Sequence, residues 1–67
     1  MNYFASRLKQ LREEQNYTQQ QLAEYLEISI RQYRRYEKAD YEPNIITLIK
    51  IADYFEVSLD YLVGRSN

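Results

Sequence analysis

The chain has 67 residues, of which 45% are hydrophobic, with no cysteine, no histidine and a formal net charge of −1. This composition excludes a disulfide-stabilised secreted fold and a cysteine or histidine metal site, and no apolar run is long enough for a signal peptide or a membrane span. One glycine and one proline are too few for a turn-rich β-fold, so we expect one small helical domain over residues 1–67, without a cofactor, in the cytoplasm.

The first predicted helix lies in the segment YFASRLKQLREEQ, residues 3–15, in which apolar residues recur at helical spacing. These residues are Phe4, Leu8 and Leu11. Asn16 is expected to end this helix, because asparagine tolerates the left-handed backbone conformation that closes many helices. Thr18 and Gln21 have the spacing of a capping box, so a second helix is predicted over QQQLAEYL, residues 19–26. Its expected inward residues are Leu22, Ala23 and Leu26.

A third helix is predicted after a connection of about three residues, Glu27 to Ser29. Ser29 is its expected N-cap and Gln32 stands at the matching capping-box position, with contact to a DNA backbone as the alternative role for both. Tyr33 and Tyr36 are expected to point to the core. Because so short a connection forces the second and third helices to cross steeply, the pair is predicted to form a helix-turn-helix.

Two further helices are predicted in the C-terminal third of the chain. Pro43 disfavours a helical conformation for the residue before it, and Asn44 is the expected N-cap of the fourth helix. The expected inward stripe of this helix consists of Ile45, Leu48, Ile49, Ala52 and Phe55. Ser58 is expected to cap a fifth helix over LDYLV, which Gly64 closes. The five segments together predict an all-α fold, a compact five-helix bundle.

The motifs of these segments resemble those of the lambda repressor and Cro-like helix-turn-helix domains, the xenobiotic-response-element family. The resemblance rests on TQQQLAEYLEISIRQYRRYEKA, residues 18–39, followed by EPNIITLIKIADYFEVSLDYLVG, residues 42–64, and it covers Phe4 to Gly64. It implies a lambda repressor-like bundle in which the second and third helices form the DNA-binding motif. The family usually has glycine where Glu27 stands and aliphatic residues where Tyr33 and Tyr36 stand. Glu27 is therefore expected to carry backbone strain if it keeps a positive φ.

Residues 28–39 gather four cations and one anion, so this segment carries +3 while the rest of the chain carries −4. Opposite the inward Tyr33 and Tyr36, the helical period places five side chains on one outward strip. They are Ile30, Arg31, Arg34, Arg35 and Lys38. Because a focused positive face on an otherwise acidic chain orients an approaching polyanion, double-stranded DNA is the expected partner.

The resemblance implies a role for the residues of this surface. In helix-turn-helix docking, the N-terminal part of the third helix enters the major groove. Arg31 and Arg35 are therefore expected to read guanine and Ile30 to touch a thymine methyl, the alternative being that both arginines contact only phosphates. Phosphate contacts are expected from Gln19, Arg34, Lys38 and Asn44. The resemblance implies that Gln19 sometimes also braces a residue of the third helix, and its alternative is an ordinary exposed glutamine.

Other residues are expected to have structural roles. The resemblance implies that Arg12 and Glu37 form a partly buried ion pair that fixes the pose of the third helix, with DNA contact by Arg12 as the alternative. Six tyrosines appear scattered over separate predicted elements, which argues against a stacking platform for single strands. They are Tyr3, Tyr17, Tyr25, Tyr41, Tyr54 and Tyr61. No group of side chains suggests catalysis, so an enzyme is not expected.

These features predict a sequence-specific transcriptional regulator that binds a palindromic operator as a homodimer in the nucleoid. The resemblance implies a repressor, the most frequent role in the family. Candidates for the dimer contact are Ile46, Tyr61 and Val63. The nearer alternatives are an antitoxin or a restriction-modification controller with the same DNA-binding mode. The more distant one is a protein-interaction module that does not touch DNA. In the family the LVG ending commonly leads into another domain, so the chain is expected to be either a minimal unit or one followed by a further domain after Asn67.

Overall fold

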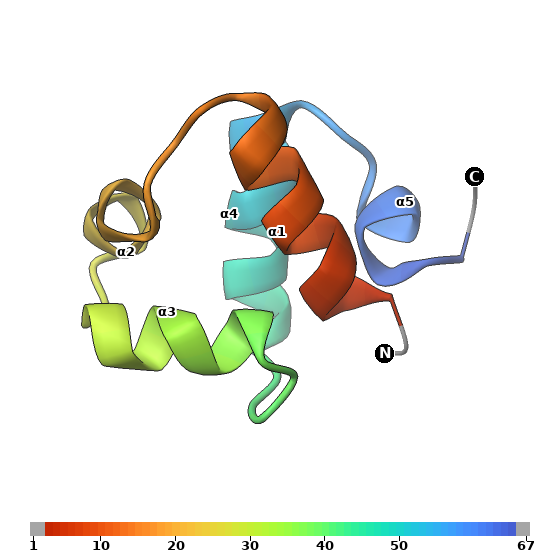
Figure 1. The fold of residues 1–67 in the computed structure, drawn as a ribbon. Helices are drawn as coiled ribbons and strands as arrows, with labels where there is room; N and C mark the ends of the chain where they lie inside the picture. The colour runs from red at the N-terminus through yellow and green to blue at the C-terminus, as the bar shows by residue number, and fades with distance from the viewer. Residues whose placement is uncertain (1–2, 66–67) are drawn as a thin grey trace.

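The computed structural model of the chain describes residues 3–65, and five α-helices follow one another in that range (Figure 1). They are α1 (Phe4–Glu14), α2 (Gln19–Leu26), α3 (Ile30–Glu37), α4 (Ile45–Phe55) and α5 (Leu59–Val63). The described range contains no strand, which confirms the predicted all-α fold. Within the same range no helix has the length and apolar character needed to cross a membrane. The expected further domain after Asn67 lies outside the described residues.

The helix starts follow the predicted caps. Thr18 accepts a hydrogen bond from the Gln21 backbone N–H, and the Gln21 side chain accepts one from the Thr18 N–H, so the capping box of α2 is confirmed. Ser29 caps α3 by accepting from the Gln32 N–H, but within the described range the second bond of a box is not formed there. Asn44 and Ser58 cap α4 and α5 in the same way.

Each of the five described helices ends in the same type of turn, in which a left-handed residue lies one or two positions after the last helical residue. These residues are Asn16, Glu27, Ala39, Glu56 and Gly64. In each case the next N–H donates back to a carbonyl five residues earlier, as in the 3.0 Å bond from Ile28 to Ala23, so these are Schellman motifs. Glu27 has φ 58°, the positive value at which backbone strain is expected. Only Gly64 is a glycine, and there a Cβ would also collide with the Tyr3 ring.

The core confirms the predicted inward residues of the first three helices and corrects those of the fourth. The buried core residues are Phe4, Leu8, Leu11, Leu22, Ala23, Leu26, Tyr33, Tyr36, Leu48, Ile51, Ala52 and Leu62. In α4 the prediction was wrong for Ile45 and Ile49, which are 57% and 45% exposed, and it missed Ile51, which is fully buried. Phe55 is half-buried. Because apolar residues surround most of this helix, periodicity alone could not select the face that meets its neighbours.

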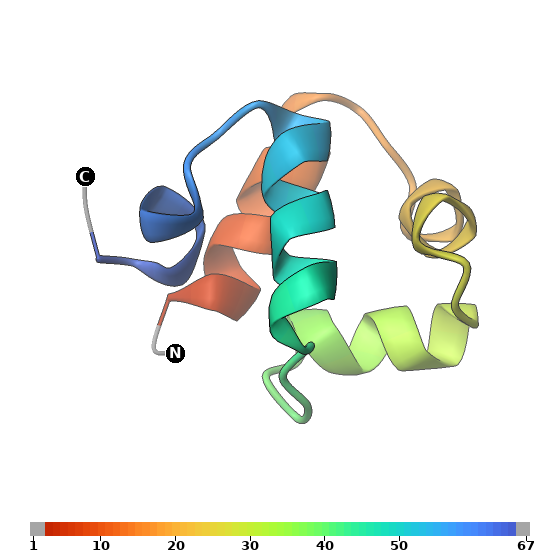
Figure 2. The ribbon, with the colours of Figure 1, turned by 180° about the vertical axis from the view of Figure 1, so that it is seen from behind.

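The arrangement of the helices presents α3 at one edge of the molecule. In Figures 1 and 2, α1 and α4 lie in the centre, α2 is seen almost end-on, and α3 lies across the bottom of the view. The predicted helix-turn-helix of α2 and α3 is therefore confirmed. Ala23 is fully buried in α2. On the far side from α2, α5 packs against α1, where the Arg7 guanidinium donates to the Tyr61 carbonyl and lies over the Tyr61 ring.

Candidate nucleic-acid interface

The basic strip comprises Arg31, Arg34, Arg35 and Lys38, and all four of its side chains are exposed. The opposite face of α3 is anchored by Tyr33 and Tyr36, which are buried. The one anion of the helix, Glu37, has a side chain only 5% exposed. Because Glu37 is buried and paired with Arg12, the exposed side of α3, together with its C-cap residue Lys38, carries four cations and no carboxylate.

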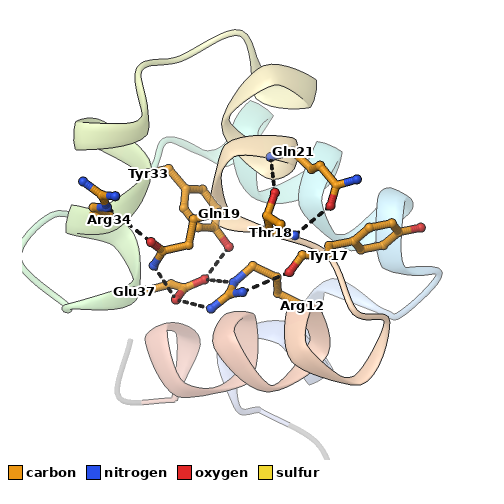
Figure 3. Close-up of polar contacts among 8 residues, drawn as sticks. All are labelled: Arg12, Tyr17, Thr18, Gln19, Gln21, Tyr33, Arg34 and Glu37. Carbon is orange, nitrogen blue, oxygen red and sulfur yellow. Dashed lines mark hydrogen bonds and ion pairs between the residues drawn. The ribbon is translucent and has the colours of Figure 1, made fainter.

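Glu37 accepts four hydrogen bonds from three helices (Figure 3). The Arg12 guanidinium of α1 donates to both carboxylate oxygens, with Nε–Oε2 and Nη2–Oε1 distances of 2.7 and 3.2 Å. The Tyr33 hydroxyl donates to Oε2 over 2.6 Å, and the Gln19 Nε2 of α2 donates to Oε1 over 3.1 Å. Arg12 also donates to the Tyr17 carbonyl, at 3.0 Å. One carboxylate thus fixes α3 against α1 and α2.

The group of Glu37 and its partners Arg12, Tyr33 and Gln19, here called the hub, shifts the pKa values of its titratable members. Burial raises the pKa of the Glu37 carboxyl, but the hydrogen bonds from Arg12, Tyr33 and Gln19 outweigh burial, so the pKa lies below its usual range. The pKa of Tyr33 is raised, first by burial and then by its bond to the Glu37 carboxylate. Hydrogen bonding to Glu37 raises the pKa of Arg12. Near neutral pH the hub is therefore an ionised pair held by a neutral phenol.

Gln19 uses both ends of its amide inside the protein. Its Nε2 donates to Glu37, and its Oε1 accepts from the Arg34 Nε over 3.2 Å (Figure 3). The residue is half-buried rather than an ordinary exposed glutamine. Because Arg34 uses only its Nε in this contact, its two terminal nitrogens remain available to an external acceptor. A chain of contacts therefore leads from the Arg12–Glu37 pair to an exposed cation of the basic strip.

A surface hollow lies between the end of α1, the start of α2 and α3. Its lining residues are Lys9, Arg12, Glu13, Tyr17, Thr18, Gln19, Gln20, Ile30, Arg34, Glu37 and Lys38. Thr18, Gln19 and Gln20, at the start of α2, are among the lining residues, and the first turn of a helix favours an anion. Lys9 is an exposed cation of the hollow that the sequence analysis did not single out. No signal in the sequence could have identified it, because only packing brings α1 beside α3.

The remaining predicted site residues differ in how freely they can reach a ligand. Arg31 and Arg35 are exposed, and the Arg35 guanidinium carbon lies 5.2 Å from the centroid of the Tyr41 ring. Ile30 is half-buried because it packs against the core and borders the hollow, so only part of its side chain can meet a base. The Asn44 Oδ1 accepts from the Thr47 N–H over 2.9 Å. Only its amide nitrogen then remains for a phosphate.

The six tyrosines outside the core lie on separate elements, as predicted, and the packing of the helices gathers them into three groups. Tyr25 and Tyr17 both pack on Tyr54, with ring centroids 4.2 and 5.3 Å away. Tyr41 stacks on Tyr36. Tyr3 and Tyr61 flank the Arg7 guanidinium. The groups form because the helix packing brings distant segments together, which residue spacing along the chain does not reveal.

Comparison with known proteins gives consistent matches. Residues 8–62 match the sequence model of a family described as helix-turn-helix. The chain is 43% identical over 65 residues to the uncharacterized HTH-type transcriptional regulator YqaE of Bacillus subtilis, covering 96% of this chain and 56% of that protein. It is 42% identical over 59 residues to the cryptic phage CTXphi transcriptional repressor RstR of Vibrio cholerae, covering 88% and 53%.

A solved structure agrees with these matches. The crystal structure of a transcriptional regulator from Listeria innocua superposes with a TM-score of 0.90 at 36% sequence identity, over 96% of this chain and 60% of that chain. The chain thus spans little more than half the length of the relatives that it matches.

Proposed function

The chain belongs to the helix-turn-helix family, in its xenobiotic-response-element and lambda repressor-like branch, and from this premise we propose that it binds double-stranded DNA sequence-specifically as a transcriptional repressor. Relatives named as transcriptional regulators, and one named as a repressor, support this proposal. Repression follows when the bound protein occupies DNA that the polymerase needs. The chemistry of binding requires no cofactor and proceeds in the cytoplasm, where the chromosome lies.

The observation that carries the proposal is the basic strip, three exposed arginines of α3 and its C-cap residue Lys38, on a helix whose single carboxylate is turned inward. With α3 in the major groove, Arg31 and Arg35 read base edges, because a guanidinium can bridge guanine O6 and N7 in one plane. Each such pair contributes roughly 1–3 kcal/mol of discrimination. The uncovered part of the Ile30 side chain contacts a thymine methyl.

A second group of residues holds the sugar-phosphate backbone and confers no base preference. It consists of Arg34, Lys38, Asn44 and Gln19, whose Nε2 has a second N–H besides the one that it donates to Glu37. The hollow beside α2 supports this assignment, because Gln19 at the start of α2, Arg34 and Lys38 all border it. Arg12 and Glu37 take no part in contact and hold α3 at the angle that the groove requires.

A homodimer on a palindromic operator completes the proposal. The described Cα atoms extend 29 × 23 × 19 Å, so one copy cannot place a reading helix in two major grooves about 34 Å apart. The exposed apolar side chains of α4 supply a surface for the second copy: Ile46 is 66% exposed, beside Ile45 and Ile49. Tyr61 and Val63 of α5, both half-buried, are candidates for the border of that contact.

Selection of bound duplexes from a random pool, followed by a salt titration, tests the proposal. We expect a palindromic motif with half-sites about one helical turn apart, and an affinity for random duplex that falls steeply as salt rises. A protein-interaction module would show no affinity for any duplex, and that result would refute DNA binding. A single half-site motif would refute the homodimer alone.

A further inference from the structure

Tyr41 lies in the connection between α3 and α4 and forms a column with two residues of α3. Its ring stacks on the Tyr36 ring, with centroids 6.1 Å apart and planes inclined by 13°. The Arg35 guanidinium carbon lies over the Tyr41 ring, 5.2 Å from its centroid. Tyr36 is buried and Tyr41 is 48% exposed, so the column leads from the core to the surface beside the basic strip.

The base of this column is fixed by the core. Phe4 and Tyr33 both make edge contacts with the Tyr36 ring, each at a centroid distance of 6.4 Å. The backbone fixes the approach of Tyr41 as well, because the Asp40 N–H donates to the Arg35 carbonyl over 3.0 Å and turns the chain back along α3. Tyr41 therefore has a defined position although it lies outside any helix.

Contact with a ring face restrains an arginine without consuming its hydrogen bonds. A guanidinium over an aromatic ring interacts through its charge and its flat face, while its N–H groups remain directed along its edges. Arg12 differs, because its donors are taken by Glu37 and by the Tyr17 carbonyl. An unrestrained surface arginine samples many rotamers, and ordering it on binding reduces the affinity gained.

We propose that Tyr41 is a positioning residue for base reading: its ring, supported by Tyr36, holds the Arg35 guanidinium at the exposed end of α3 with its N–H edges free for one base pair of each half-site. This inference rests on the proposed function, in which Arg35 meets the duplex. It adds a specificity-determining residue in the connection after the reading helix. Tyr41 acts through Arg35 and needs no base contact of its own.

Three variants of the chain test the proposal: Tyr41→Leu removes the ring face but keeps an apolar side chain over Tyr36, Tyr41→Phe keeps the ring, and Arg35→Ala removes the reader. The first measurement is the affinity ratio between the selected duplex and a duplex changed at the base pair that Arg35→Ala no longer distinguishes. We expect Tyr41→Leu to lower this ratio about two- to fivefold, the size of an exposed cation–π contact, and Tyr41→Phe to preserve it. Affinity for random duplex and its salt slope should stay unchanged in both.

The second measurement needs no DNA. In the free protein, the NMR signal of the Arg35 Nε–H should carry a ring-current shift that Tyr41→Leu abolishes and Tyr41→Phe retains, while helical circular dichroism shows that all variants are folded. An unchanged affinity ratio in Tyr41→Leu, together with a lowered ratio in Arg35→Ala, would overturn the role of Tyr41 and leave the proposed function intact. An unchanged ratio in Arg35→Ala would instead overturn base reading by Arg35, and the inference with it.

Discussion

Tyr33 and Glu37, one turn apart on α3, are joined by a 2.6 Å hydrogen bond in which the phenol donates to the carboxylate. The bond ties a ring at the centre of the core to the ion pair that links α3 with α1. A phenol at this place does what an aliphatic residue could not, because it fills the core and satisfies a buried carboxylate oxygen at once. The orientation of the reading helix is thereby set from its buried side.

Replacing Glu37 should destabilise the fold strongly. Glu37→Gln removes the charge that compensates the largely buried Arg12 guanidinium, so we expect the free energy of unfolding to fall by about 3 kcal/mol. Urea denaturation followed by circular dichroism measures the loss. Glu24→Gln is the matched control, since Glu24 is exposed and, among the described residues, its side chain bonds only to Gln20 of the same helix. If the two variants were equally stable, Glu37 would not stabilise the fold through its bonds to Arg12, Tyr33 and Gln19.

The same hub should make stability depend on pH at both ends of the scale. The folded pKa of Glu37 is below its ordinary value of about 4.3, so its contribution is complete above that value and is lost as the pH falls through the folded pKa. The folded pKa of Tyr33 is raised above its ordinary value of about 10, so its contribution is lost as the pH rises beyond 10 or so. Urea midpoints across pH measure both effects.

Two variants separate these contributions. Glu37→Gln should flatten the acid side of the profile, and Tyr33→Phe should flatten the alkaline side. If the profile of Glu37→Gln kept the full acid dependence, other carboxylates would be responsible for it.

The residues of the basic strip should differ in role, since some are expected to read bases and others to contact phosphates. Arg31→Ala or Arg35→Ala should relax preference at one base pair of each half-site, at a cost of roughly 1–3 kcal/mol. Arg34→Ala should weaken all duplexes about equally and reduce the salt slope by about 1 per site. Binding assays over single-base variants of the selected duplex, each at several salt concentrations, distinguish the two patterns. An unaltered motif with both reader variants would mean that the arginines contact phosphates only.

The left-handed residue between α2 and α3 should accept glycine with a gain in stability. Glu27 has φ 58°, a conformation that costs a residue with a Cβ about 1–2 kcal/mol, and glycine avoids this cost at an entropic loss of about 0.5–1 kcal/mol. Glu27→Gly should therefore raise the free energy of unfolding by up to about 1 kcal/mol. Glu24→Gly, within α2, should lower it by about the same amount. Destabilisation by Glu27→Gly in urea denaturation would show that the Glu27 side chain has another role.

The exposed isoleucines of α4 should govern assembly on DNA. Ile46→Glu places a charge in the proposed contact, so the complex with a two-half-site duplex should dissociate at lower salt, whereas binding to an isolated half-site should persist. Lys50→Glu changes the charge of an exposed position on the same helix and should leave the stoichiometry unchanged. Mass photometry or ultracentrifugation of the complexes gives the number of copies bound. If two copies of the Ile46→Glu variant bound the two-half-site duplex as tightly as the unchanged protein does, the contact between the copies would lie elsewhere.

Local chemistry made much of this structure predictable from sequence. The caps at Thr18, Ser29, Asn44 and Ser58 fix where helices begin because a side-chain oxygen meets an N–H three residues on. The helical period also placed the four cations of the basic strip opposite Tyr33. In α4 the same reasoning failed, since apolar side chains at Ile45, Ile46, Ile49 and Ile51 gave several possible inner faces.

The sequence by itself determined the five helices, the N-caps of the last four and the outward direction of the basic strip, because these features depend on residues within a few positions of one another. Only the tertiary structure decided that Gln19 links Glu37 to Arg34, that Lys9 joins the hollow beside α2, and that Tyr41 lies under Arg35. Those relationships depend on how α1, α2, α3 and the connection to α4 meet. Such contacts are set by the shape and burial of the whole core, which no local pattern of residues specifies.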